Sequence, residues 1–176
     1  MPGLSAKVFR TYNASITLCS ELQKTSQMVR EHHVTAEQRK KEGDVNALYN
    51  FYQIANKNVA ELCNHQKATP ASHGVALAKM DEKIEKAQGE YNEAKKAKNS
   101  SKMETVSKRL EKLKAERATK DELKNVSLGT SKINYNDPRI TIAWCKRFDV
   151  PIQKPFPKTL LAKFAWAMGV EPDFKF

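Results

Sequence analysis

Hydrophobic residues along most of the chain recur every three or four positions, which is the spacing of one face of an α-helix. The pattern is strongest between Asp44 and the Asn64-His65 pair, where it predicts a long core helix. Asp44 can cap its start, Gly43 breaks the chain before it, and Thr69-Pro70 follows its end. The apolar face of this helix consists of Val45, Leu48, Tyr49, Tyr52, Ala55, Val59, Leu62 and Cys63.

The segment before this helix has a weaker pattern. Residues 1–12 carry the β-forming pair Val8 and Phe9 and predict a connector or a short strand. Asn13 can cap a helix over residues 14–24. The partial apolar stripe of that helix is Ile16, Leu18, Cys19 and Leu22.

Residues 25–34 are polar, and the adjacent His32 and His33 are expected to be exposed. Adjacent side chains do not share a helix face, so the two histidines make a poor metal pair. The sequence Thr35-Ala36-Glu37-Gln38 fits a capping box and predicts a short helix that ends near Lys41.

Residues 72–124 are rich in Ala, Lys and Glu and contain no proline. Their apolar positions alternate spacings of three and four on both sides of a polar break at Asn99-Ser100-Ser101, which predicts an antiparallel coiled-coil hairpin. Each arm would be roughly 35–40 Å long at 1.5 Å per residue. The thin seam predicts marginal stability and mobility, and a dimerising coiled coil is the alternative. The seam positions are Leu77, Met80, Ile84, Ala87, Tyr91, Ala94, Met103, Val106, Leu110 and Leu113.

Two further helices are predicted after the hairpin. Asp137 can cap the first, with Pro138 at its first position, and this helix runs to Phe148. Pro157 can start the second helix, which Gly169 terminates. We expect both to pack on the N-terminal helices, because about 50 residues are too few for a secure core. The positions expected to face inward are Ile140, Ala143, Trp144, Phe148, Leu160, Leu161, Phe164, Ala165 and Met168.

The charge balance favours a polyanionic partner. The chain of 176 residues has 31 Lys and Arg against 20 Asp and Glu, a net charge of +11, with no basic tail. Nucleic acid fits this excess, since cations that contact a duplex release its counterions. A soluble protein that is merely basic is the alternative. No apolar run suggests a membrane span or a signal peptide, and no Gly-rich phosphate loop suggests ATP or a dinucleotide, so no cofactor is expected.

The cysteines predict free thiols. Cys19, Cys63 and Cys145 are odd in number and far apart, and each lies in an apolar helical context, which is typical of buried thiols in a reducing compartment. Cys63 and His65 are too close in sequence, and lack further ligands nearby, for a zinc site. No metal is expected.

The stretch Ser131–Arg139 carries the most suggestive chemistry. Tyr135 lies there between two basic residues, in a connector just before a predicted helix N-terminus, a setting that suits a nucleophile attacking a phosphate. Arg10 and His65 are further candidates. The predicted helix C-terminus at His65 favours a proton on its imidazole. Taken singly, each also fits a structural role, as a surface arginine, a helix cap or a packing tyrosine.

Four segments of the chain resemble, in the same order, the C-terminal part of eukaryotic type IB DNA topoisomerases. The hairpin matches the coiled-coil linker of that family in character more than in sequence, while residues 1–18, 44–67 and 126–168 are covered well. The matching segments are KVFRTYNASITL at residues 7–18, LCNHQK at 62–67, LGTSKINYNDPRITIAWCK at 128–146 and KFAWAM at 163–168.

The resemblance implies a mainly α fold in three parts. Residues 1–71 would be an incomplete part of the tyrosine-recombinase/topoisomerase IB catalytic core, residues 72–124 the antiparallel coiled-coil linker, and residues 125–176 a small helical C-terminal domain with the nucleophilic tyrosine. The implied protein is nuclear and acts on double-stranded DNA, with no membrane, metal or ATP.

The resemblance also assigns roles to residues. Tyr135 would attack a DNA phosphodiester to form a 3′-phosphotyrosine and free a 5′-hydroxyl, after which strand rotation and religation relax the DNA. Arg10 and His65 would donate hydrogen bonds to the non-bridging phosphate oxygens. Asn134 would lie beside the cleavage site, and Lys132 near phosphate.

The family site further uses a second arginine and a lysine that acts as general acid, both preceding the segment that matches residues 1–18. We therefore expect this polypeptide alone not to relax DNA. It is expected to be a fragment, and the alternative is a small subunit whose large subunit supplies that Arg and Lys. Asn136 departs from the usual leucine of the family, and the hairpin is short. A non-enzymatic, basic coiled-coil module that binds nucleic acid or a partner helix is the competing hypothesis.

Overall fold

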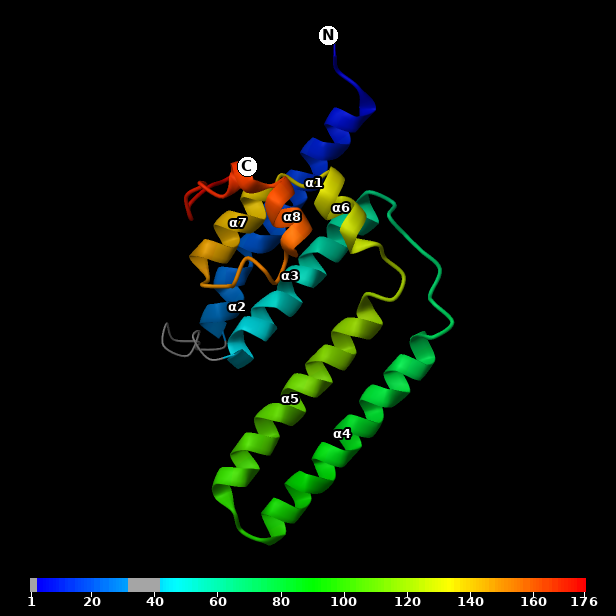
Figure 1. The fold of residues 1–176 in the computed structure, drawn as a ribbon, viewed down its shortest axis with the longest axis vertical. Helices are drawn as coiled ribbons and strands as arrows, with labels where there is room; N and C mark the ends of the chain where they lie inside the picture. The colour runs from blue at the N-terminus through cyan, green and yellow to red at the C-terminus, as the bar shows by residue number, and fades with distance from the viewer. Residues whose placement is uncertain (1–2, 32–41) are drawn as a thin grey trace. The chain divides into compact units, whose positions relative to one another are not determined.

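The computed structural model describes residues 3–31 and 42–176, and the regular structure in these ranges is helical (Figure 1). The one β-type pairing there is an isolated bridge between Gln66 and Val126. The predicted mainly α fold is confirmed. No helix in the described ranges combines the length and the apolar character needed to cross a membrane. In chain order the elements are α1 (Ala6–Gln23), α2 (Thr25–Glu31), α3 (Glu42–Leu62), α4 (His73–Lys96), α5 (Ser100–Glu122), α6 (Leu128–Asn134), α7 (Pro138–Arg147), α8 (Lys158–Lys163) and the 3₁₀-helix η2 (Ala165–Ala167).

The chain folds into two compact units. Residues 1–67 and 126–176 form one, here called the helical body, and residues 68–125 form the other, here called the hairpin. The helices that precede and follow the hairpin thus share one unit, while the division into three domains stays a prediction.

The core of the helical body forms around Trp144 of α7. Its ring lies against Tyr52 of α3, with the ring centroids 5.3 Å apart. Its indole N–H donates to the Thr25 hydroxyl over 3.0 Å, so the buried donor is satisfied. The Tyr52 hydroxyl shares a hydrogen bond of 3.2 Å with Thr141. Leu18 and Leu22 of α1 and the face of α3 complete this cluster.

The predicted apolar face of α3 is confirmed, with one exception at its C-terminal end. Leu48, Tyr52, Ala55, Val59 and Cys63 are buried, and Val45 and Tyr49 are partly buried. Leu62, the last residue of the helix, is 54% exposed. The predicted start is also wrong, because α3 begins at Glu42 and Gly43-Asp44 continue the helix instead of breaking it.

The N-terminal segment is helical where a connector or strand was predicted. Ser5 has extended backbone angles, and α1 begins directly after it at Ala6, so the expected start after Asn13 is wrong. Val8 and Phe9 are exposed on this helix. No proline or glycine interrupts residues 6–23, and the helix continues through the β-forming pair into the part that packs on α3. Helix α2 occupies part of the polar segment at residues 25–34, for which no helix was predicted. His32, His33 and the capping box at residues 35–38 lie outside the described residues.

The C-terminal helices confirm one prediction and correct another. Helix α7 has Asp137 as its N-cap, whose carboxylate accepts the Arg139 backbone N–H over 2.9 Å, and Pro138 follows as predicted. The second predicted helix is broken, because α8 ends before Phe164 and η2 follows. Ala165, expected to face inward, is exposed, and Ala167 is buried instead. The tighter 3₁₀ turn accounts for this shift of the inward position.

The hairpin consists of two antiparallel helices, as predicted (Figure 1). Helix α4 ends at Lys96, and Lys98 takes a left-handed conformation with φ 52°. The Asn99 N–H then bonds back to the Ala94 carbonyl over 3.0 Å, and the Asn99 side chain caps α5 by accepting the Lys102 N–H over 3.0 Å. The polar break therefore lies where it was predicted. With 24 and 23 residues, α4 and α5 are about 35 Å long.

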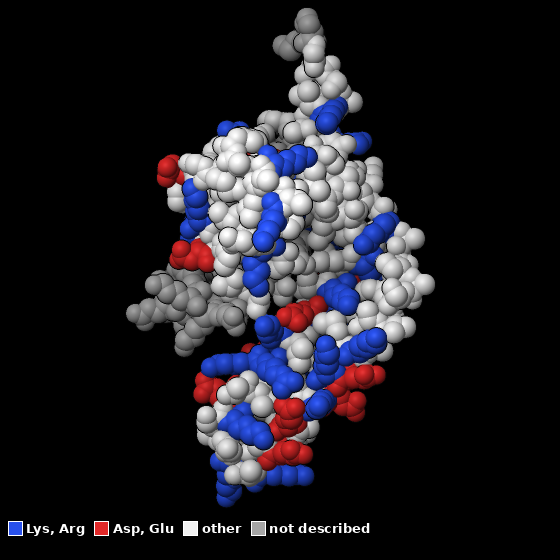
Figure 2. Space-filling model, in the orientation of Figure 1, with Lys and Arg blue, Asp and Glu red and all other residues white. Residues whose placement is uncertain are grey.

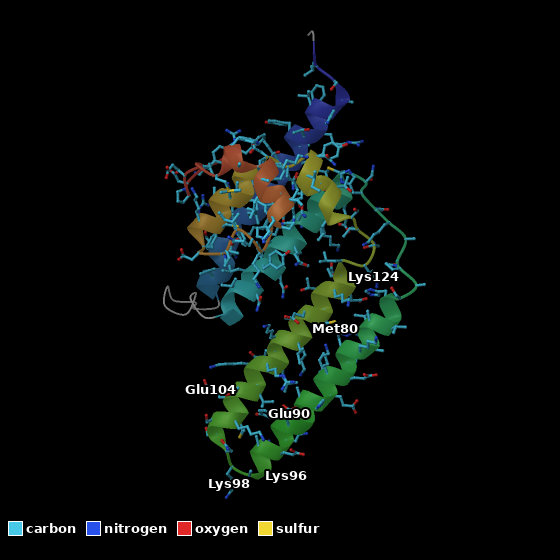
Figure 3. All side chains as sticks on the ribbon, in the orientation of Figure 1. Met80, Glu90, Lys96, Lys98, Glu104 and Lys124 are labelled. Carbon is cyan, nitrogen blue, oxygen red and sulfur yellow. The ribbon has the colours of Figure 1, made fainter. Side chains whose placement is uncertain are left out.

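The apolar seam of the hairpin is thin. Ala87, Val106 and Leu110 form its buried cluster, with Ile84, Tyr91 and Leu113 partly buried around it. Exposed ion pairs add to this contact, since Arg117 binds Asp81 at 2.9 Å and Arg109 binds Glu90 at 3.0 Å. Figure 2 shows cationic and anionic side chains interspersed over the hairpin, and Figure 3 shows Met80 and Glu90 on α4 and Glu104 on α5. Such exposed pairs contribute little to stability, so the seam residues matter most.

We expect Leu110→Ala to destabilise the hairpin without affecting the helical body. The side chain of Leu110 is 6% exposed, and truncating a buried leucine costs about 2–5 kcal/mol. Helical ellipticity should fall at a lower temperature than in the wild type. The tryptophan fluorescence transition should not shift, because both tryptophans, Trp144 and Trp166, belong to the helical body. Lys112→Ala, at an exposed position of α5, is the control, and a shift of the fluorescence transition in Leu110→Ala would contradict the independence of the two units.

Candidate active site around Tyr135

The end of α3 places His65. After the last helical residue, Asn64 takes a left-handed conformation with φ 56°. The Asn64 N–H bonds to the Glu61 carbonyl over 3.0 Å, and the His65 N–H bonds to the Ala60 carbonyl over 2.8 Å. These two bonds form a Schellman motif, which asparagine tolerates better than most residues other than glycine. The His65 carbonyl then accepts the Ser127 N–H over 2.8 Å, so the backbone of His65 is fixed on both sides.

Tyr135 directly follows α6, a short helix that the sequence pattern did not predict. The Ser131 carbonyl ends this helix by accepting both the Tyr135 N–H over 2.9 Å and the Asn136 N–H over 3.0 Å. Ser15 of α1, which is fully buried, holds the same turn. Its hydroxyl donates to the Tyr135 carbonyl over 3.2 Å and accepts the Asp137 N–H over 3.0 Å. The backbone around Tyr135 is thereby tied to α1 as well as to α6.

Arg139 stabilises the start of α7, next to this turn. Its guanidinium makes a bidentate pair with the Asp137 carboxylate, at 2.7 Å for the shortest contact. The same guanidinium lies 4.8 Å from the ring centroid of Phe174 and 5.8 Å from that of Trp166. The planar arginine side chain is thus held by an anion and two aromatic rings, which fixes the N-cap that follows Tyr135.

Arg10, His65 and Tyr135 converge although they come from three separate segments. The guanidinium carbon of Arg10 lies 5.7 Å from the centroid of the Tyr135 ring. The imidazole of His65 lies 5.1 Å from the same ring, centroid to centroid. Two nitrogen donors therefore flank a half-buried phenol, an arrangement suited to binding an anion that reacts with the phenol oxygen.

The imidazole of His65 is biased towards its neutral form. Burial, and then the positive charge of Arg10, lower the pKa of His65 from its usual 6.5. The expectation that the helix C-terminus favours a proton here is therefore wrong. His65 lies beyond the left-handed turn at Asn64, and the nearby guanidinium together with the loss of solvent outweighs the helix dipole.

Lys132 lies close to Tyr135 in sequence, but its amine is engaged elsewhere. The ammonium donates to the Pro155 carbonyl over 3.1 Å and lies 5.3 Å from the centroid of the Tyr52 ring. Burial lowers the pKa of Lys132 to about 8. The structure thus ties Lys132 to the loop before α8, and a role near phosphate stays a prediction. Asn134, the last residue of α6, is exposed beside Tyr135.

A buried amide pair holds the residue that follows Tyr135. The Asn136 side chain donates to the Asn56 side-chain oxygen over 3.1 Å, and the Asn56 amide donates to the Leu128 carbonyl over 3.2 Å. Asn56 is fully buried and Asn136 is 7% exposed. The side-chain oxygen of Asn136 is the one buried side-chain polar atom without a partner in the described ranges. This pair connects the middle of α3 to the turn at Tyr135.

Metal-binding groups are not gathered in this site. Within residues 3–31 and 42–176, no cluster of three or more His, Cys, Asp or Glu side chains could hold a metal ion. Cys63 and Cys145 are buried free thiols and Cys19 is partly buried. Burial raises the pKa of Cys145 to about 12, so this thiol stays protonated and unreactive.

Two sequence models of known families match the chain. One, described as "Eukaryotic DNA topoisomerase I, catalytic core", matches residues 1–98. The chain belongs to the eukaryotic DNA topoisomerase I family. The second, described as "C-terminal topoisomerase domain", matches residues 107–176, which include Tyr135. Family membership confirms the resemblance noted in the sequence, and the stretch between the two matches, residues 99–106, contains Asn99 and the start of α5.

Relatives from plants and animals align with all or nearly all of the chain. "DNA topoisomerase 1 beta" of Arabidopsis thaliana is 44% identical over 201 residues, covering 100% of this chain and 20% of the relative. "DNA topoisomerase 1" of Caenorhabditis elegans is 42% identical over 180 residues, covering 97% of this chain and 21% of the relative. "DNA topoisomerase I, mitochondrial" of Homo sapiens is 39% identical over 198 residues, covering 100% and 31%. The chain spans about a fifth to a third of the length of these curated relatives.

Sequence reasoning found the three residues that flank one another in this topoisomerase I segment but missed the residues that hold them. Ser15, Ser131 and Asn56 are fully buried polar residues on predicted helices or next to the predicted turn. For Ser15 and Asn56 the only sequence signal is a polar residue at a position where the helical period places the core, and Ser131 lies on α6, which was not predicted. Such an isolated position carries no information about its partner, which in the case of Ser15 lies more than a hundred residues away.

We expect the amide pair to show energetic coupling. Asn56→Ala leaves the Asn136 N–H and the Leu128 carbonyl without these partners, and each unpaired buried group costs about 1–3 kcal/mol. Asn136→Leu removes the oxygen that has no partner in the wild type. The double variant should therefore lose less stability than the sum of the single losses, by about 0.5–3 kcal/mol. Urea unfolding followed by tryptophan fluorescence measures this cycle, and strict additivity would contradict the coupling.

We also expect a pH dependence from Lys132. Its pKa is about 8 in the folded state against 10.5 for a free lysine, so between these values the unfolded state binds more protons. The cost of burying Lys132 is therefore full below pH 8 and is relieved as the pH rises towards 10.5. The free energy of unfolding of the wild type, minus that of Lys132→Met, should increase over this range. Lys158→Met, at an exposed position, should show no such trend, and parallel curves for wild type and Lys132→Met would contradict the buried amine.

Proposed function

We propose that this chain forms the nucleophile-bearing part of a type IB DNA topoisomerase, which relaxes supercoiled DNA by transient cleavage of one strand. The observation that carries the proposal is the convergence of Arg10 and His65 on the ring of Tyr135. Membership of the eukaryotic DNA topoisomerase I family supports it. Asn134, exposed next to Tyr135, is proposed to lie beside the cleaved bond.

In the proposed reaction the phenol oxygen of Tyr135 loses its proton and bonds to the phosphorus of a DNA phosphodiester. The bond between phosphorus and the 5′-oxygen breaks, and that oxygen takes up a proton. The products are a 3′-phosphotyrosine and a free 5′-hydroxyl. Religation reverses these steps, so the number of phosphoester bonds is conserved and no ATP is needed. Donors from Arg10 and His65 would stabilise the charge on the non-bridging oxygens, and each such donor is worth about 10²–10³ in rate.

Double-stranded DNA is the proposed partner, and the net charge of +11 supports this choice. We further propose that a second polypeptide segment completes the site with an arginine and a lysine, and that the isolated chain does not relax DNA. Val8, Tyr12 and Ile16, spaced by four residues, form an apolar row on α1, and each is 40% exposed or more. This row supports the proposal, because a second segment would cover it. The nucleus is the proposed location, although some relatives are named mitochondrial.

A hybrid protein tests the proposal. Residues 1–176 would replace the matching segment of the Arabidopsis thaliana relative, and a nicked duplex would trap the covalent complex because the short 5′-hydroxyl strand diffuses away. We expect a DNA-linked protein band with the wild-type sequence and none with Tyr135→Phe. Tyr91→Phe, which alters a tyrosine of the hairpin, should keep the band.

The alternative function, a basic coiled-coil module that binds nucleic acid without catalysis, predicts a different result. DNA would bind, but no covalent band would form, and Tyr135→Phe would change nothing. A folded hybrid without a band, or a band that survives in Tyr135→Phe, would therefore contradict the topoisomerase role. Mixing the isolated chain with the remainder of the relative tests whether a second segment completes the site. The covalent band should appear only when both parts are present.

A further inference from the structure

We infer that Ser131 is a positioning residue that sets the tautomer of His65. In this arrangement the serine hydroxyl donates to Nδ1 of His65, and the neutral imidazole carries its hydrogen on Nε2. The consequence for catalysis rests on the proposed function, whereas the tautomer is a property of the chain itself.

The geometry makes Ser131 a common anchor for the histidine and the tyrosine. The Ser131 hydroxyl oxygen lies 2.7 Å from Nδ1 of His65. The carbonyl of the same residue accepts the backbone N–H groups of Tyr135 and Asn136. Ser131 is fully buried, so its own hydroxyl and carbonyl are shielded from solvent. One residue therefore fixes both the imidazole and the start of the turn that carries the phenol.

The direction of the hydrogen bond follows from the number of donors and acceptors. A neutral imidazole has one nitrogen that donates and one that accepts. If Nδ1 donated, the hydroxyl hydrogen of Ser131 would need another acceptor, and none occurs among the hydrogen bonds of the described residues. If the serine donates, its hydrogen and the Nδ1 lone pair are both satisfied. The second arrangement leaves no buried hydroxyl hydrogen unpaired.

The tautomer matters because the imidazole has one hydrogen to offer. Arg10 of α1, Tyr135 after α6 and the end of α3 surround His65, and Arg10 is the charged group among them. With its pKa lowered from 6.5, His65 is mostly neutral at pH 7. An imidazole with its hydrogen on Nδ1 would donate that hydrogen to Ser131 and could not donate to a phosphate. With the hydrogen on Nε2, the nitrogen opposite Ser131 stays a donor.

Nitrogen-15 NMR of the histidines in the full chain tests the inference, because long-range correlations between ring carbon-bound hydrogens and ring nitrogens distinguish the two tautomers. We expect the wild type to show His65 with its hydrogen on Nε2 alone. Ser131→Ala should produce a resolvable share of the Nδ1 tautomer and raise the pKa of His65, since the donor to the neutral form is lost. Ser131→Thr, which keeps a hydroxyl, should restore the wild-type spectrum.

Thr130→Ala is the matched control for the spectrum, because this neighbouring hydroxyl of α6 pairs with Ser127 and not with His65. Circular dichroism and tryptophan fluorescence would show that each variant is folded. If Ser131→Ala failed to fold, the wild type and Ser131→Thr would still report the tautomer. A wild-type signal from the Nδ1 tautomer, or identical shifts and pKa values in a folded Ser131→Ala, would overturn the inference.

The catalytic consequence is measured in the hybrid protein at several pH values. Ser131→Ala should slow formation of the covalent band by about 10- to 100-fold, as loss of an outer hydrogen-bond partner does for metal-bound histidines. Ser131→Thr should retain most of the rate. If the wild-type hybrid forms no band, the proposed function fails, while the NMR measurement on the chain still decides the tautomer.

Discussion

The packing of Trp144 against Tyr52 is part of the hydrophobic core on which the rest of the helical body depends. It brings α7 onto α3, and the hydrogen bond from the indole to Thr25 ties both to the segment that follows α1. Arg10 lies in α1, His65 follows α3 and Tyr135 follows α6. Their convergence is therefore a consequence of the packing of α1 and α6 on α3 more than of any attraction between the three side chains. An arginine and a neutral imidazole have little reason to approach each other without it.

Polar contacts then fix the positions of the Tyr135 turn and the His65 imidazole, which apolar packing defines only approximately. Ser15, Asn56 and Ser131 are buried hydroxyl or amide groups that bind the turn at residues 135–137 or the imidazole of His65. Hydrogen bonds are directional, so each one fixes an orientation of the bonded groups that an apolar contact would leave variable. The cost is visible at Asn136, whose side-chain oxygen is buried without a partner. A leucine there would avoid that cost but could not bind Asn56.

The hydrophobic period predicted the long elements and failed at their ends. The faces of α3 and α7 and the two helices of the hairpin follow directly from the spacing of apolar residues. The start of α1 and the existence of α6 depend on tertiary contacts, which override the local preference of Val8 and Phe9 or supply the missing partners of a seven-residue helix. Prediction of the candidate site was limited in the same way. Arg10, His65 and Tyr135 could be named from motifs, whereas the protonation of His65 and the orientation of the Lys132 amine depend on burial, which no motif encodes.

The bridge between Gln66 and Val126 pairs the two chain segments that flank the hairpin in sequence. Together with the bond from the Ser127 N–H to the His65 carbonyl, it closes the chain on itself at the point where the hairpin leaves and rejoins the helical body. The hairpin is thus an insertion with adjacent ends, and its cluster of Ala87, Val106 and Leu110 is its own. Residues can be added or removed in pairs across the turn at Lys98 without changing the register of any helix that carries Arg10, His65 or Tyr135. The length of the hairpin is therefore free to diverge while the site is retained.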